Sequence, residues 1–167
     1  MSGAHTLILG WGNPGRRDDG LGPALAAAVA AAAPVGVTVD SDYQLQVEDA
    51  AELARHRRVL LVDADRAGEE PFTLRRLAPG GGGIGFSSHS VTPQALLALS
   101  RDLFGAAPET WLMGIRGYEF DEFGEGLSPR AGDNLAAATA FVRAALDADA
   151  FHEFQPSPRT VRAPRSE

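Results

Sequence analysis

Short apolar runs alternate with alanine- and leucine-rich segments through the first 64 residues of the chain. The short runs are rich in Leu, Ile and Val, as in β-strands, whereas the longer segments have the composition and spacing of helices. Residues 59–62 are apolar without interruption, which is typical of a strand covered on both faces. The predicted order is strand 6–10, helix 21–33, strand 37–40, helix 48–57 and strand 59–63. This alternation predicts a parallel sheet with helices on its faces.

The second half of the chain continues the pattern with less regularity. Residues 79–85 contain five glycines and predict a loop, while Thr92 followed by Pro93 is typical of a helix start. Further predicted elements are an edge strand at 72–77, a helix at 92–103, a strand at 110–115 and a helix at 133–148. We predict a single three-layer α/β/α domain over residues 1–150, with a mostly parallel, five-stranded, twisted sheet. Residues 151–167 contain prolines and arginines and predict a flexible tail.

A length of 167 residues suits one domain with its own core. The formal net charge is −7 without a basic stripe, which argues against nucleic acid and against a membrane as partners. The absence of cysteine excludes disulfides, a cysteine nucleophile, an iron–sulfur cluster and a thiolate zinc site. No apolar run approaches the ~18–20 residues of a membrane span, and the first residues do not resemble a signal peptide. We expect a cytoplasmic protein. The sequence does not indicate its oligomeric state, and a monomer is consistent with it.

A glycine-rich loop lies between the first strand and the first helix. Gly10, Gly12 and Gly15 satisfy G-x-G-x-x-G, the dinucleotide-binding pattern in which pyrophosphate sits at the helix N-terminus. Here Asp18 and Asp19 stand at that helix start, where two carboxylates would repel a phosphate. The related P-loop requires a Lys and a Ser or Thr that this loop lacks. No nucleotide is therefore expected, and a nucleotide-binding module on a Rossmann-like fold stays as the alternative hypothesis.

Two acidic residues and one histidine are the candidate site residues. Asp19 follows the glycine loop, and Asp63 stands at the carboxyl end of an apolar strand, where open parallel sheets place their site residues. His89 lies among serines between the second glycine-rich loop and the next helix. The remaining histidines, His5, His56 and His152, are expected to be exposed. Two carboxylates and an imidazole suit a divalent transition metal such as zinc or nickel.

Each candidate also has a structural interpretation. Asp18 or Asp19 can cap the helix or interact with its dipole. One of Asp63 and Asp65 is expected to form the turn after the strand, and neighbouring serines can hold His89. A serine–histidine hydrolase is a weaker alternative, because no Ser stands in a G-x-S-x-G motif.

The sequence resembles the hydrogenase maturation endopeptidases, which remove the C-terminal extension from the large-subunit precursor of nickel–iron hydrogenases. The strongest match is residues 7–22, LILGWGNPGRRDDGLG, which is similar to the strand, GxGN and acidic opening of that family. Residues 59–64 resemble its second acidic motif, and Ser88-His89 resembles its histidine motif. The resemblance runs in order from about residue 6 to about residue 149.

The resemblance implies a site, a cofactor and a partner. Asp19, Asp63 and His89 match the family's metal-binding acid, acid and histidine, and Asp19 and Asp63 would also be catalytic. Asn13 and Asp18 match positions around the site, where loop-shaping and supporting roles are expected. The implied metal is nickel, supplied by the partner, a nickel–iron hydrogenase large-subunit precursor. The implied activity is that of a metal-dependent or aspartic-type peptidase.

Three further segments resemble one subgroup of the family, associated with cytoplasmic bidirectional, NAD-linked hydrogenases. They are residues 44–48, 115–120 and 124–128. Many members of the family carry a Gly-Gly-Thr-type loop near the position of Tyr43 and Gln44, which this sequence lacks. We expect this difference to affect which precursor the protein accepts. A further alternative is a maturation chaperone that has the same fold and binds the precursor without cleaving it. The presence of all three implied metal ligands argues against this alternative.

Overall fold

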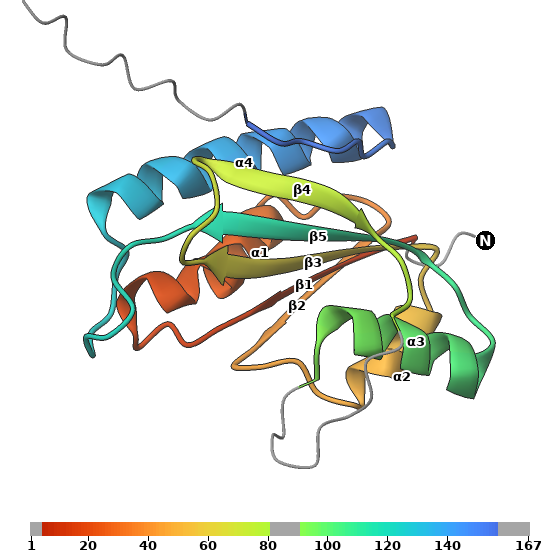
Figure 1. The fold of residues 1–167 in the computed structure, drawn as a ribbon. Helices are drawn as coiled ribbons and strands as arrows, with labels where there is room; N and C mark the ends of the chain where they lie inside the picture. Colours follow the sequence, from red (N-terminus) through yellow and green to blue (C-terminus); the bar gives the residue numbers. More distant parts are fainter. Residues whose placement is uncertain (1–4, 81–90, 157–167) are drawn as a thin grey trace, which may run out of the picture.

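The computed structural model describes residues 5–80 and 91–156 (Figure 1). In these ranges five strands form one sheet in the order β2-β1-β3-β5-β4. The strands are β1 (Thr6–Trp11), β2 (Val37–Asp42), β3 (Arg58–Asp65), β4 (Phe72–Leu77) and β5 (Glu109–Arg116). The helices are α1 (Leu21–Ala31), α2 (Asp49–Ala54), α3 (Pro93–Phe104) and α4 (Pro129–Ala148), with a short 3-10 helix η1 (Arg17–Gly20) before α1. The predicted α/β architecture with its five-stranded sheet is confirmed.

Four of the five strands run in the same direction. β1 pairs in parallel with both β2 and β3, and β3 pairs in parallel with β5. The edge strand β4 alone among the described strands is antiparallel to its neighbour, β5. The carboxyl ends of the four parallel strands therefore meet at one edge of the sheet, on the left in Figure 1. In the described ranges no helix combines the length and the apolar character that a membrane crossing requires.

The helices cover both faces of the sheet, with α1 and α4 on one face and α2 and α3 on the other (Figure 1). Alternate residues of β3 divide between the two resulting cores. Leu60 and Val62 pack in the core with α1 and α4, while Val59 and Leu61 pack in the core with α2 and α3. All four side chains are fully buried, which explains the uninterrupted apolar run. The same alternation directs the next residue, Asp63, to the face of α2 and α3.

Helix α4 begins at Pro129 rather than at Asp133, where the sequence analysis placed its start. Ser128 is the cap, because its side chain accepts a hydrogen bond from the N–H of Ala131. Pro129 then occupies the first helical turn, where its missing N–H leaves no hydrogen bond unmade. The prediction was wrong because Gly132, a weak helix former, obscures this start signal.

Residues 151–156 pack against the domain, so the flexible tail predicted from residue 151 does not begin there. Phe151 is 8% exposed, and Phe154 exchanges two backbone hydrogen bonds with Leu74 of β4. The ring of Phe154 stacks on Phe72 with 4.6 Å between centroids and lies 5.5 Å from Phe141. Aromatic packing thus extends the folded unit past residue 150, and residues 157–167 lie outside the described residues.

His56 is buried, which corrects the expectation of an exposed histidine. Its side chain is 8% exposed; Nδ1 lies 2.8 Å from the carbonyl oxygen of Glu52, and Nε2 lies 3.1 Å from Oγ1 of Thr38. Both ring nitrogens are therefore engaged between α2 and β2. The basic neighbours of His56 indicated a solvated helix end, whereas the ring itself turns inward. His5 and His152 are exposed, as predicted.

Replacing Phe154 by Ala is expected to lower the free energy of unfolding by about 2 kcal/mol, because two ring contacts are lost at a partly buried site. Urea denaturation measures the change. Phe123→Ala is the matched control, since that ring is 83% exposed. Equal midpoints for the two variants would show that the segment after α4 adds no stability.

Candidate functional site

The candidate site lies at the carboxyl edge of the sheet, where β1 and β3 end side by side. Gly10 and Val62 are the last residues that pair between these strands. The glycine loop after β1 and Asp63 near the end of β3 therefore reach the same edge. The 3-10 helix η1, which the sequence analysis did not predict, turns the chain from the loop into α1 and carries Asp18 and Asp19.

The glycines of the loop allow η1 and α1 to approach the end of β1 closely. A Cβ atom on Gly10 would overlap the carbonyl group of Gly22, and one on Gly12 would overlap the carbonyl oxygen of Asp19. Gly12 also has a φ of +143°, which residues with side chains rarely adopt. Backbone oxygens, rather than N–H donors, face these two glycines. Close packing between strand and helix thus accounts for the glycine pattern without a bound phosphate.

Asp18 is fully buried and joins η1 to the connection that follows β5. Its carboxylate accepts hydrogen bonds of 2.7 to 2.9 Å from the N–H groups of Tyr118, Glu119 and Ser128 and from the Ser128 hydroxyl. Burial by itself raises the pKa of Asp18, but these hydrogen bonds outweigh it and bring the pKa below its ordinary value. Asp18 makes no capping hydrogen bond to α1, whose N-cap is Gly20. Its contacts hold the loop after β5 in place.

Asp19 and Asn13 stabilise the glycine loop from within. Oδ2 of Asp19 accepts a hydrogen bond of 2.8 Å from the N–H of Asn13, and Oδ1 of Asn13 accepts one of 2.9 Å from the N–H of Gly15. The second carboxylate oxygen of Asp19 makes no hydrogen bond to any residue in the described ranges. The loop thus fixes the position of Asp19 while engaging only one of its oxygens.

Asp63 is partly buried beside Asp19, and its pKa is raised to about 7. Burial of the carboxyl group is the main cause, and the negative charges of Asp19 and Asp65 raise the pKa further. A hydrogen bond of 2.8 Å from the N–H of Ala64 to Oδ1 acts in the opposite direction. A carboxyl group with this pKa exists in both protonation states near neutral pH, so it can both accept and donate a proton.

Of the two acids at the end of β3, Asp65 is the one that forms the turn. Its Oδ1 accepts hydrogen bonds from the N–H groups of Ala67 and Gly68, at 3.0 and 2.9 Å. A Cβ on Gly68 would overlap the Asp65 carboxylate, so a larger residue there would displace this carboxylate from its place in the turn. Asp63 makes no turn of this kind and faces the pocket described next.

Asp63 lines a pocket of about 540 Å³ on the face of the sheet that α2 and α3 cover. Its walls come from the ends of β3 and β5, from β4 and from the start of α3. Further lining residues include Trp11, Thr73, Arg75, Val91, Gln94 and Leu112. Thr73 and Arg75 were not among the site residues predicted from the sequence. The alternation within 72–77 was the available signal, since it places both on the face opposite the buried Phe72 and Leu74.

Asp19 and Asp63 come together in the structure, whereas His89 lies outside the described residues. The electrostatic effect of Asp19 on the pKa of Asp63 reflects their proximity. Within residues 5–80 and 91–156, no three His, Cys, Asp or Glu side chains are grouped as metal ligands. Each of the two carboxylates has one oxygen bound to a backbone N–H and one without a hydrogen bond to a described residue. The two acids therefore suit a divalent cation as oxygen ligands, and the three-residue metal site stays a prediction.

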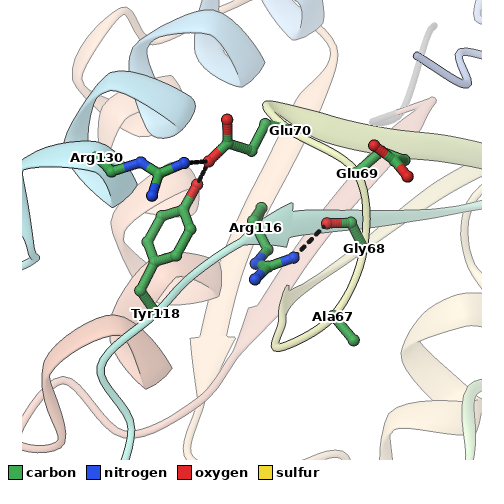
Figure 2. Close-up of a pocket in the computed structure, with 7 residues that line it drawn as sticks. All are labelled: Ala67, Gly68, Glu69, Glu70, Arg116, Tyr118 and Arg130. Atoms are coloured by element: carbon green, nitrogen blue, oxygen red, sulfur yellow. Dashed lines mark hydrogen bonds and ion pairs between the residues drawn. The ribbon is translucent and has the colours of Figure 1, made fainter. Parts of the chain in front are cut away.

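A second, smaller pocket of about 300 Å³ lies beyond the turn after β3 (Figure 2). Figure 2 shows the side chains of Glu70, Tyr118 and Arg130 pointing toward one another. The carboxylate of Glu70 accepts hydrogen bonds from the Tyr118 hydroxyl and the Arg130 guanidinium, and Arg116 donates to the carbonyl of Gly68. These contacts join the β3–β4 connection to α4 and to the segment after β5. The pocket is thus a structural junction in which Glu70 pairs with Arg130 and Arg116 binds the backbone.

The fold matches solved structures of hydrogenase maturation proteases. The hydrogenase maturating endopeptidase HybD from E. coli superposes with a TM-score of 0.70 over 90% of this chain and 97% of its own, at 21% identity. The [NiFe] hydrogenase maturation protease HycI from Thermococcus kodakarensis KOD1 gives a TM-score of 0.65 over 86% and 93% of the two chains, at 19% identity. A hydrogenase 2 maturation peptidase from Thaumarchaeota archaeon SCGC_AB-539-E09 gives 0.61 over 85% and 97%, at 20% identity. No family model and no curated protein matches the sequence significantly. The structural neighbours therefore define a shared fold.

Replacing Asp18 by Asn is expected to lower the free energy of unfolding by about 3 kcal/mol. The variant turns one buried acceptor into an N–H donor that faces other donors. Urea denaturation measures the loss. Asp121→Asn is the matched control, because that side chain is 95% exposed. A similar midpoint for both variants would contradict the role assigned to Asp18.

The raised pKa of Asp63 predicts that its contribution to stability falls as the pH rises from about 4 to about 7. In this window the unfolded chain releases the Asp63 proton while the folded chain keeps it, so rising pH favours unfolding. Above the folded-state pKa the contribution is constant. Asp63→Asn lacks this contribution, and its stability relative to wild type should increase by up to about 1.4 kcal/mol per pH unit within the window. Urea denaturation of both proteins across the window measures this, and parallel pH curves would contradict it.

Proposed function

We propose that this chain is an endopeptidase that removes the C-terminal extension of a nickel–iron hydrogenase large-subunit precursor. The observation that carries the proposal is the convergence of Asp19 and Asp63 at the carboxyl edge of β1 and β3. This convergence occurs in a fold that the chain shares over 90% of its length with the endopeptidase HybD. The pocket beside Asp63 offers room for a polypeptide segment that carries the scissile bond.

The proposed chemistry is hydrolysis of one peptide bond by a water molecule bound between the two carboxylates. An ionised carboxylate takes a proton from the water as the water oxygen attacks the carbonyl carbon. The proton then passes to the amide nitrogen as the C–N bond breaks. In the metal-free chain, the pKa of Asp63 of about 7 suits this proton transfer near neutral pH. Asp19 is held for its part by the hydrogen bond from the N–H of Asn13.

Nickel enters this scheme as cargo of the precursor rather than as a resident cofactor. The proposed ligands are Asp19, Asp63 and His89, and each carboxylate has an oxygen without a hydrogen bond to a described residue. Binding the precursor through its nickel would restrict cleavage to precursors that have been loaded. The proposed peptidase is of the aspartic type where nickel serves recognition alone, and metal-dependent where nickel also polarises the scissile carbonyl.

The precursor proposed as partner belongs to a bidirectional, NAD-linked hydrogenase, and the proposed location is the cytoplasm. The support for this choice is the subgroup resemblance of residues 44–48, 115–120 and 124–128. No nucleotide is part of the scheme, because the glycine loop packs against backbone oxygens of η1 and α1.

The test is a mass-spectrometric cleavage assay on nickel-loaded and nickel-free hydrogenase large-subunit precursors. We expect loss of a C-terminal peptide from the loaded precursor alone. Asp19→Asn, Asp63→Asn and His89→Ala should each lower the cleavage rate by about 100-fold or more, because each removes a proton-transfer group or a proposed nickel ligand.

Asp121→Asn and His152→Ala are the matched controls, since both side chains are exposed and lie outside the proposed site. They should cleave at the wild-type rate. A wild-type rate for Asp63→Asn would overturn the catalytic assignment, and equal cleavage of the nickel-free precursor would overturn recognition through nickel. A rise in melting temperature with NAD or ATP would instead support the nucleotide-binding alternative.

A further inference from the structure

The pocket beside Asp63 continues across the face of the sheet as far as β4. Asp63 of β3 lies opposite Gly114 of β5, and Gly114 lies opposite Thr73 of β4. Gly114 has no side chain to divide the pocket, and a Cβ there would press against Asp65 and Thr73. Arg75 stands two residues further along β4 on the same face and also lines the pocket. One continuous surface therefore links Asp63 to Arg75.

Arg75 is exposed and makes no ion pair, side-chain hydrogen bond or ring contact with any residue in 5–80 or 91–156. Every other arginine in these ranges contacts a carboxylate, a backbone carbonyl or an aromatic ring. Its neighbour Arg76, on the opposite face, lies over Trp111 at 5.7 Å from the ring centroid and 4.0 Å from Glu109. Arg75 thus places in the pocket a guanidinium that no residue in the described ranges neutralises, and the complementary ligand is an anion.

The spacing between Asp63 and Arg75 fits a polypeptide better than a small anion. The two residues lie on strands separated by β5, so about 10 Å separates their backbones across the sheet. The offset of two residues along the strand adds about 7 Å at right angles to this distance. The diagonal between the two backbones is therefore about 12 Å. An extended chain covers this distance in three to four residues. Apolar side chains such as Leu112 and Val91 also line the pocket.

We propose that Arg75 binds a carboxylate of the substrate polypeptide, located about three residues from the scissile bond. The planar guanidinium matches a carboxylate through two parallel hydrogen bonds. An Asp or Glu side chain and a C-terminal carboxylate share this chemistry. The inference rests on the proposed function for the position of the scissile bond at Asp63, whereas carboxylate binding at Arg75 does not require cleavage.

Peptide binding tests the proposal independently of hydrolysis. The probe is a fluorescein-labelled 15-residue peptide that spans the processing site of a hydrogenase large-subunit precursor. One version carries Glu three residues from the scissile bond on both sides, and a second carries Gln at those positions. A third version carries Gln and ends three residues after the scissile bond, with either a free or an amidated C-terminus. Fluorescence anisotropy should give about tenfold tighter binding of a carboxylate-bearing version to the wild type. Arg75→Gln should remove this preference, while Arg76→Gln, on the opposite face, should retain it.

Arg75→Glu should prefer a version with Lys at the same positions. The NMR signal of the Arg75 Nε–H group should shift on peptide binding, and that of Arg76 should not. Loss of the preference on Glu-to-Gln exchange identifies a side-chain carboxylate, and loss on amidation identifies the C-terminal one. An undiminished preference in Arg75→Gln, or a wild type that does not distinguish the versions, would overturn the proposal. An Arg75-dependent preference without cleavage of any precursor would overturn the proposed function alone.

Discussion

The buried carboxylate of Asp18 is the interaction on which the geometry of the candidate site depends. Transfer of an ionised carboxylate to the interior is unfavourable unless hydrogen bonds replace its hydration, and four donors do so here. All four belong to the segment between β5 and α4. The next residue, Asp19, takes its position from the same short 3-10 helix. Ser128 both binds Asp18 and caps α4, so one charge sets the site loop and the start of the last helix.

The two acids at the end of β3 lie on the same face of the strand but have different roles. Asp63 and Asp65 lie two residues apart and are both carboxylates at the sheet edge. Asp65 accepts both hydrogen bonds of the turn through its Oδ1, and its charge contributes to the raised pKa of Asp63. Asp63 takes no part in this turn and lies near Asp19, at the edge of the pocket. The turn-forming acid thus also affects the protonation of its neighbour.

The sheet, its order of elements and the two acids at its carboxyl edge could be predicted from the sequence, because their signals are local. An apolar run marks β3, and glycines mark the loop before Asp19. The partners of Asp18 could not be predicted, since they lie about a hundred residues further along the chain. The inward turn of His56 and the packing of Phe154 depend in the same way on distant segments. Charge composition around these residues indicated solvent exposure, and tertiary contacts decided otherwise.

The hydrogen bonds between Phe154 and Leu74 also affect how the molecule meets other copies of itself. β4 is an outer strand of the sheet, and an outer strand offers unpaired backbone groups that can template intermolecular β-pairing. Phe154 satisfies both backbone groups of Leu74 on the open side, and its ring covers Phe72. The segment after α4 thus blocks the middle of this edge, which protects the protein against edge-to-edge aggregation at that strand.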